Sequence, residues 1–172
     1  MRIEEDFFQR DALEIAPLLL GMRICRKMPD GSVLSSRILE TEIYRGEEDM
    51  GCHASKGKTK RNQMMYEKGG HAYIYLIYGL HWLFNIVTGE KDAPQAVLIR
   101  ALEKPWDGPA KWTRAFSLTG EQNGIYLPHS QEIWLEAGNP LPYTTAPRVG
   151  IDYAKEPWKS MPWRLIATEG GK

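Results

Sequence analysis

Hydrophobic and polar residues alternate along several short stretches of the chain, and a period of two is typical of β-strands. The clearest stretch, residues 39–46, places Glu40, Glu42 and Tyr44 on one face of an extended chain. The turn signal "PDG" at residues 29–31 separates it from a second strand-like stretch that begins at residue 22. We therefore expect an antiparallel hairpin whose second strand carries two acids and a tyrosine on one face.

Apolar and aromatic residues dominate positions 71–89, which predicts two strands in place of one helix. Tyr, Ile and Val crowd a helix and Gly79 would interrupt it, so the two strands are expected to meet at Tyr78 and Gly79. Residues 95–103 predict a strand that is mostly buried. Three further short strands are predicted at residues 132–138, 147–152 and 163–168.

Two segments have the three- and four-residue spacing of helices. Residues 10–21 offer Asp11 as an N-cap and Gly21 as a stop, and Pro17 predicts that this helix is short or kinked. Residues 107–120 place Pro109 in a favourable first-turn position. Together the elements predict an α+β fold, in which one domain over residues 1–172 is built on a mostly antiparallel sheet with flanking helices.

Composition and charge narrow the class of protein. About a quarter of the 172 residues are charged and the formal net charge is zero, which argues against a protein that coats nucleic acid by electrostatics alone. Residues 47–70 are polar and too long for a tight turn, so we expect a functional loop. Within it, "KGKTKR" at residues 56–61 places four cations in six residues, and composition alone fits a solvated loop equally well.

Several classes of partner are not expected. The N-terminus is acidic without an apolar segment, and no apolar run is long enough for a bilayer, which predicts a cytoplasmic protein without membrane contact. Cys25, Cys52 and the four histidines show no zinc-ligand spacing, and glycine-rich phosphate loops are absent, so we expect no metal and no cofactor. Nothing in the sequence indicates an obligate dimer, and a monomer is expected.

Candidate chemistry remains open from the residues alone. Glu42 fits a general base between apolar walls, and it equally fits a surface residue paired with a cation. His53 fits a site residue or an ordinary exposed histidine. Arg100 lies on an apolar strand and needs a carboxylate, a phosphate or a cleft, with Glu42 and Glu103 as candidate partners. Two neighbouring acids also leave open a carbohydrate or nucleoside hydrolase.

Five blocks in one order resemble the alkyladenine (3-methyladenine) DNA glycosylase family, whose members excise alkylated purines. The resemblance runs from about residue 6 to residue 168. The blocks are "RILETEIYRGEEDMGCHAS" at 37–55, "KTKRN" at 58–62, "YIYLIYGLHWLFNIV" at 73–87, "VLIRALEKP" at 97–105 and "GPAKWTRAFSL" at 108–118. It implies a curved sheet with a protruding β-hairpin and double-stranded DNA with alkylated purine lesions as partner.

The resemblance also implies roles for particular residues. Glu42 would be the general base that activates water, and Arg100 and the backbone carbonyl near Ala167 would help hold that water. The flipped base would lie between side chains that form the walls of a base pocket, and against a residue that screens the base. An intercalating side chain, the wedge, would fill the gap that the base leaves in the DNA double helix. The walls are Tyr44, His53 and Tyr75, the screen against guanine's exocyclic amine is Asn85, and the wedge is Tyr78.

Two further expectations depend on the same resemblance. Lys56, Lys58, Lys60 and Arg61 would contact the DNA backbone, so their loss should reduce the salt dependence of binding. Gly51 and Cys52 stand where the family usually has small residues such as Ala, which would change the exocyclic groups that a base pocket tolerates. With no lysine nucleophile at the matched site, we expect hydrolysis without strand cleavage. The rival interpretation is a catalytically inactive nucleic-acid binding domain on the same fold.

Overall fold

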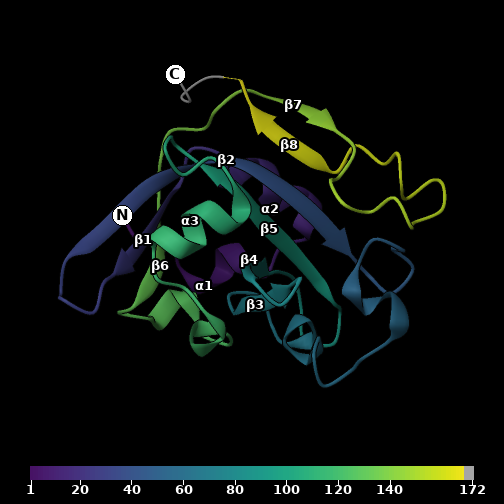
Figure 1. Cartoon of the computed structure of the whole chain (residues 1–172), viewed down its shortest axis with the longest axis horizontal. Helices are drawn as coiled ribbons and strands as arrows, with labels where there is room; N and C mark the ends of the chain where they lie inside the picture. Colours follow the sequence, from purple (N-terminus) through teal and green to yellow (C-terminus); the bar gives the residue numbers. More distant parts are fainter. Residues whose placement is uncertain (169–172) are drawn as a thin grey trace.

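The computed structural model describes residues 1–168. Within these residues eight strands form one antiparallel sheet in the order β3-β4-β5-β2-β1-β6, and β8 pairs with β2 and carries β7 on its other side (Figure 1). The strands are β1 (Arg23–Lys27), β2 (Val33–Arg45), β3 (Ala72–Ile77), β4 (His81–Val87), β5 (Gln95–Leu102), β6 (Ile133–Glu136), β7 (Tyr143–Ala146) and β8 (Arg164–Ala167). The α-helices are α1 (Glu5–Phe8), α2 (Ala12–Leu19) and α3 (Pro109–Ala115), and 3₁₀ turns lie at His53–Lys56, Gln63–Tyr66, Gly120–Gln122 and Leu127–His129.

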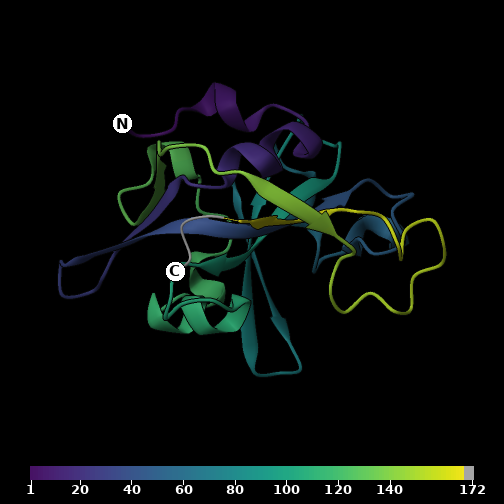
Figure 2. The ribbon, with the colours of Figure 1, turned by 90° about the horizontal axis from the view of Figure 1, so that it is seen from above.

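Helices cover both faces of the curved sheet, which confirms the predicted α+β class. Figure 2 shows α1 and α2 on one face and α3 on the other. Phe8 and Ile15 from the first two helices, and Trp112 and Phe116 from the region of α3, are completely buried in the main core. This core fixes β2 and β5 at the centre of the sheet, where burial of apolar side chains is the dominant stabilising term.

Most predicted elements are confirmed. The N-cap Asp11 accepts a hydrogen bond from the Leu13 N–H at 2.9 Å, and α2 ends just before Gly21, with Pro17 inside it. The β1–β2 hairpin turns at "PDG", and Cys25 and Cys52 are free and buried.

The strand predicted at residues 147–152 is wrong. The side chain of Arg148 turns into the protein and the N–H of Val149 donates to a side chain, so neither residue joins a strand ladder. The partner of β8 is the preceding segment, β7. Strand β7 could not be recognised from its residues, because "YTTA" has no buried face and therefore no alternation.

The pairing of β2 with β5 has two register shifts, one on each side of Glu40. Ile38 pairs with Leu102 and Glu40 with Ala101, while Thr41 already pairs with Ile99. Arg100 is therefore left without a direct partner on β2. Such bulges re-aim side chains, and this irregularity lies next to the buried acid of β2.

The β3–β4 hairpin projects from the sheet on the side of α3 (Figure 2). Its turn consists of Tyr78 and Gly79, with φ of 53° and 63°, and the Leu80 N–H donates to the Ile77 carbonyl at 3.0 Å. Positive φ at both central residues is the requirement of a type I′ hairpin turn, which favours Asn and Gly. A tyrosine in the first position is therefore conformationally strained.

Candidate active site

Glu42 lies on the part of β2 that has β5 on one side and β8 on the other, and its side chain is 0% exposed. Oε2 accepts from the Val149 N–H at 2.6 Å, and Oε1 accepts from the Tyr44 hydroxyl at 3.0 Å. Burial raises the pKa of Glu42 above its usual value, although the positive charge of Arg100 and these hydrogen bonds oppose the rise. The deprotonated carboxylate is therefore a stronger base than that of an exposed glutamate.

Arg100 contacts both acids of β2. Its Nη1 lies 3.4 Å from Glu42 Oε1, and its Nε lies 3.5 Å from Glu40 Oε1. Glu40 Oε1 also accepts from Arg164 Nη1 at 3.0 Å. Of the two partners considered from sequence, Glu42 is the one that Arg100 meets, because Glu103 pairs with Arg37 instead. Arg100 therefore lies between the two carboxylates in the ion-pair network, with Glu40 bridging it to Arg164.

An aromatic slot opens beside Tyr44. It is lined by Tyr44, His53, Met65, Tyr73, Tyr75 and Asn85, from β2, β3, β4 and the loop between β2 and β3. The His53 and Tyr75 ring centroids are 4.4 Å apart, and those of Tyr73 and Tyr75 are 5.4 Å apart. Asn85 is buried and donates from Nδ2 to the Tyr73 carbonyl at 3.1 Å. The structure thus brings together all four residues that the sequence assigned to base walls and screening.

His53 is held in the slot in its neutral form. Its Nδ1 lies 2.9 Å from the Tyr73 hydroxyl, and burial, with smaller effects of Arg61 and Lys56, lowers the pKa of His53 to about 4. A neutral imidazole presents an uncharged ring to the slot at physiological pH. It can stack against a flat ligand without repelling a positive charge on it.

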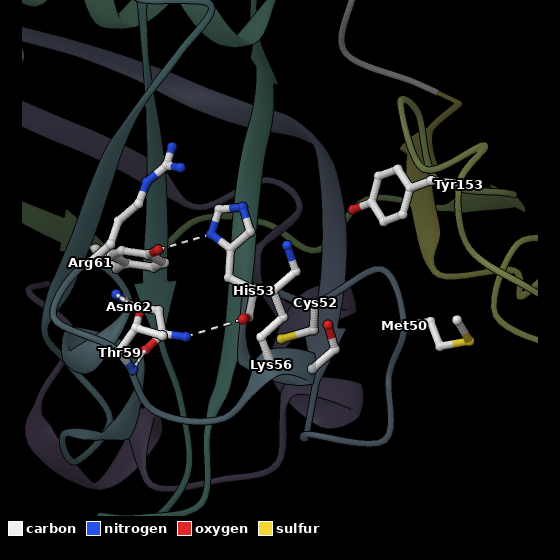
Figure 3. A pocket seen from close by; sticks show the side chains of 10 residues that line it. Met50, Cys52, His53, Lys56, Thr59, Arg61, Asn62 and Tyr153 are labelled. Carbon is white, nitrogen blue, oxygen red and sulfur yellow. Dashed lines mark hydrogen bonds between the residues drawn. The ribbon is translucent and has the colours of Figure 1, made fainter.

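A wider pocket of about 350 Å³ adjoins the slot and shares His53 and Tyr73 with it. In Figure 3, His53 and Arg61 lie on one side of this outer pocket and Met50 and Tyr153 on the other. Lys56 also lines it. Two cations at its wall make the entrance to the slot attractive to anions such as phosphate.

The basic loop, residues 56–61, borders this entrance. Lys56, Lys58, Lys60 and Arg61 are all exposed, so their charges face solvent. Arg61 also donates from Nη2 to the Leu76 carbonyl at 2.8 Å, which ties the loop to the β3–β4 hairpin. The loop and the hairpin therefore present one continuous surface next to the slot.

The hairpin tip exposes two large apolar residues. Tyr78 is 89% exposed and Leu80 is 67% exposed. Side chains of this size gain nothing for the fold when they stand in solvent, so they are suited to insertion into a partner. Leu80 was missed from sequence, where it looked like an ordinary strand residue beside the turn.

Comparison with known proteins decides the family. The model of the methylpurine-DNA glycosylase family matches residues 6–106 and 103–170, which is nearly the whole chain. The chain belongs to this family. It is therefore a DNA glycosylase whose substrate is DNA.

Relatives support the same assignment. A protein of Methanocella arvoryzae is 42% identical over 95% of this chain and 90% of its own length. Proteins of Natranaerobius thermophilus and Myxococcus xanthus are 39% and 40% identical, over 96% and 95% of this chain and 94% and 88% of their own lengths. Each is named, as a provisional assignment, a 3-methyladenine DNA glycosylase.

Three residues of the site were not predicted from the sequence of this glycosylase family member. Arg148 is buried against Tyr44, Val149 donates its N–H to Glu42, and Met65 lines the slot. Met65 carried no signal, because it lies in a polar loop without periodicity. Arg148 did carry a signal, because an arginine in a segment interpreted as a strand needs a buried partner.

One expectation from the resemblance differs from the geometry, and a second stays a prediction. Gly51 packs against Arg148 and not in the slot wall: a Cβ there would lie 2.9 Å from Nη2, so glycine makes room for the guanidinium. The backbone carbonyl near Ala167 stays a prediction as a partner of the water; on β8 the residue that pairs with Glu42 is Arg164, and Ala167 lies three residues further along. The backbone that reaches Glu42 is that of Val149.

No helix within residues 1–168 is long and apolar enough to cross a bilayer. Among the same residues, His, Cys, Asp and Glu side chains form no group of three that could hold a metal ion.

Proposed function

We propose that this chain releases alkylated or deaminated purines, such as 3-methyladenine, 7-methylguanine and hypoxanthine, from duplex DNA by hydrolysis of the N-glycosidic bond. The observation that carries the proposal is Glu42, a fully buried carboxylate with a raised pKa that is hydrogen-bonded to Tyr44 in the wall of the aromatic slot. A general base needs this combination of basicity and proximity to the bound substrate.

In the proposed reaction Glu42 takes a proton from water while the water oxygen bonds to C1′ of the deoxyribose. The C1′–N bond breaks and its electron pair leaves with the base. A purine alkylated at N3 or N7 is cationic, so it departs without a strong general acid. The carboxylate also stabilises the positive charge that develops on the sugar in an oxocarbenium-like transition state. Arg100, held by Glu40 and 3.4 Å from Glu42, orients the carboxylate and the water.

The slot supplies recognition of the base. Tyr44 on one side and His53 with Tyr75 on the other would stack on the flipped purine, and a cationic purine gains about 0.5–2 kcal/mol from a cation–π contact. The neutral form of His53 preserves that gain. Asn85, held by the Tyr73 carbonyl, would screen against the exocyclic amine of guanine.

The hairpin supplies base flipping. Unstacking a purine costs a few kcal/mol, and an aromatic side chain in the gap offsets part of that cost. Tyr78 is exposed and stands at a strained turn, and strain of this kind persists where a function requires it. The basic loop would bind the DNA backbone beside it.

The test is base release by Glu42→Gln from a panel of duplex oligonucleotides, each with one defined lesion. We expect the single-turnover rate to fall about 10²- to 10⁴-fold, the usual contribution of a general base. Glu103→Gln is the matched control, because Glu103 lies on the same sheet but pairs with Arg37, and its rate should stay near wild type. The wild-type rate should also fall as the pH is lowered through the raised pKa of Glu42.

Two outcomes would overturn the proposal. If Glu42→Gln released the bases as fast as the wild type, Glu42 would not be the base. If the wild type bound lesion DNA and released nothing, the inactive binding domain would be correct.

A further inference from the structure

Arg148 occupies an unusual place behind the slot. Its guanidinium carbon lies 5.0 Å from the Tyr44 ring centroid and 5.1 Å from that of Trp163, so the cation lies against two aromatic rings. Nη1 and Nη2 bind Asp49 Oδ2 and Oδ1 at 2.7 and 2.8 Å, and Nη1 also donates to the Ile43 carbonyl. The side chains of Arg148 and Asp49 are both 0% exposed. These contacts fix the guanidinium in place.

The Tyr44 ring separates Arg148 from the slot. Tyr44 lines the slot and Arg148 does not; because the guanidinium lies over one face of the ring, the other face is the one left free for a ligand in the slot. The Tyr44 hydroxyl donates to Glu42, which holds the outer end of the ring in place. The two carboxylate oxygens of Asp49 each accept from one Nη atom of Arg148. In this bidentate arrangement the negative charge of Asp49 lies in the plane of the guanidinium. The ring therefore meets the cation without a carboxylate between them.

A cation on one face of an aromatic ring weakens the attraction of the other face for a second cation. The guanidinium draws π-electron density toward itself, and it repels a positive charge across the ring. A neutral purine stacks mainly through dispersion and apolar burial, which the guanidinium affects little. The Tyr44 ring should then attract a cationic base less strongly than the Tyr75 ring does. Among the contacts of residues 1–168, no cation lies over the Tyr75 ring.

The geometry points to Arg148 as a specificity-determining residue: it reduces the preference for cationic alkylpurines and so shifts the balance toward neutral lesions. This inference rests on the proposed function, because it concerns the ratio between two substrates of the same slot. Arg148 acts through Tyr44 and touches no reacting atom.

The experiment removes both charges of the buried pair together, because removing one would leave an unpaired buried charge. In Arg148→Gln with Asp49→Asn, two amides keep hydrogen bonding but carry no charge. The quantity measured is the ratio of kcat/KM for 7-methylguanine, which is cationic, to that for hypoxanthine, which is neutral, in one duplex sequence. The intrinsic lability of each glycosidic bond cancels when this ratio is compared between variants.

We expect the ratio to rise about 3-fold or more in the double variant, within the roughly 2- to 30-fold that one cation–π contact is worth. Arg148→Lys keeps the charge and should keep the wild-type ratio even if both rates fall. The matched control is Arg45→Gln with Asp11→Asn. Arg45 follows Tyr44 on β2, so its side chain lies on the other face of the strand, and it forms a bidentate ion pair with Asp11. Its ratio should not change.

An unchanged ratio in the double variant, with both rates lowered by one factor, would overturn the inference and leave Arg148 a merely structural residue. If the amide pair does not fold, the apolar pair Arg148→Met with Asp49→Leu gives the same measurement. A wild type that released neither base would overturn the proposed function itself, which is a different result from an unchanged ratio.

Discussion

Replacement of Tyr78 by asparagine should stabilise the protein and slow its reaction. Tyr78 is 89% exposed, so its removal uncovers no core, and its φ of 53° is a conformation that asparagine adopts more easily. Relief of this strain is worth roughly 1 kcal/mol. For a chain of this size that corresponds to a rise in Tm of roughly 2–4 °C.

The same substitution removes the aromatic ring proposed to fill the gap left by the flipped base. Stacking of one base on an aromatic side chain is worth about 1–3 kcal/mol, so kcat/KM on a duplex should fall roughly 5- to 150-fold. On a single-stranded oligonucleotide with the same lesion no base pair must be opened, and the loss should shrink to a few-fold.

The assay combines calorimetry with single-turnover base release on both substrates. Tyr143→Asn is the control, because Tyr143 is also exposed but lies on β7, away from the hairpin. A fall in Tm for Tyr78→Asn would refute the argument from strain. An equal loss of rate on duplex and single strand would refute the role of Tyr78 as a wedge.

Two further predictions concern stability. Asp49→Asn leaves Arg148 buried without its charge partner and should cost roughly 3–5 kcal/mol, whereas Asp107→Asn, in an exposed pair, should cost less than about 1 kcal/mol; thermal unfolding measures both. The pKa of His53 is lowered to about 4, so below pH 6.5 the unfolded chain takes up a proton that the folded protein refuses. Stability should therefore be complete above pH 6.5 and fall toward pH 4, by at most about 1.4 kcal/mol per pH unit, and His53→Gln should remove this slope between pH 6 and 5 in urea titrations.

The local elements were predictable because their signals are local. Asp11 caps a helix wherever its side chain can reach the first turn, and "PDG" turns a hairpin without help from the rest of the chain. The strand pair around Tyr78 and Gly79 was predictable for the same reason. The wrong strand at 147–152 has the opposite cause: long-range contacts to Asp49 and Glu42 override the local pattern there.

The site was predictable only in part. The residues alone left Glu42 undecided between base and surface acid, because its burial depends on β5 and β8, which lie far away in sequence. The resemblance named the slot residues correctly as neighbours. It did not name Val149, whose N–H binds Glu42, since this residue lies in a segment without regular structure and therefore without periodicity.

The hydrogen bond from the Val149 N–H to Glu42 also determines when the site can form during synthesis. The two residues are 107 positions apart, so the Glu42 carboxylate stays without its amide donor until the last part of the chain has left the ribosome. The basic loop and the Tyr78 hairpin are synthesised before that point, since translation runs from the N-terminus to the C-terminus. A nascent or truncated chain that ended before residue 147 would thus carry the surface proposed to hold DNA without the anchored carboxylate beside it.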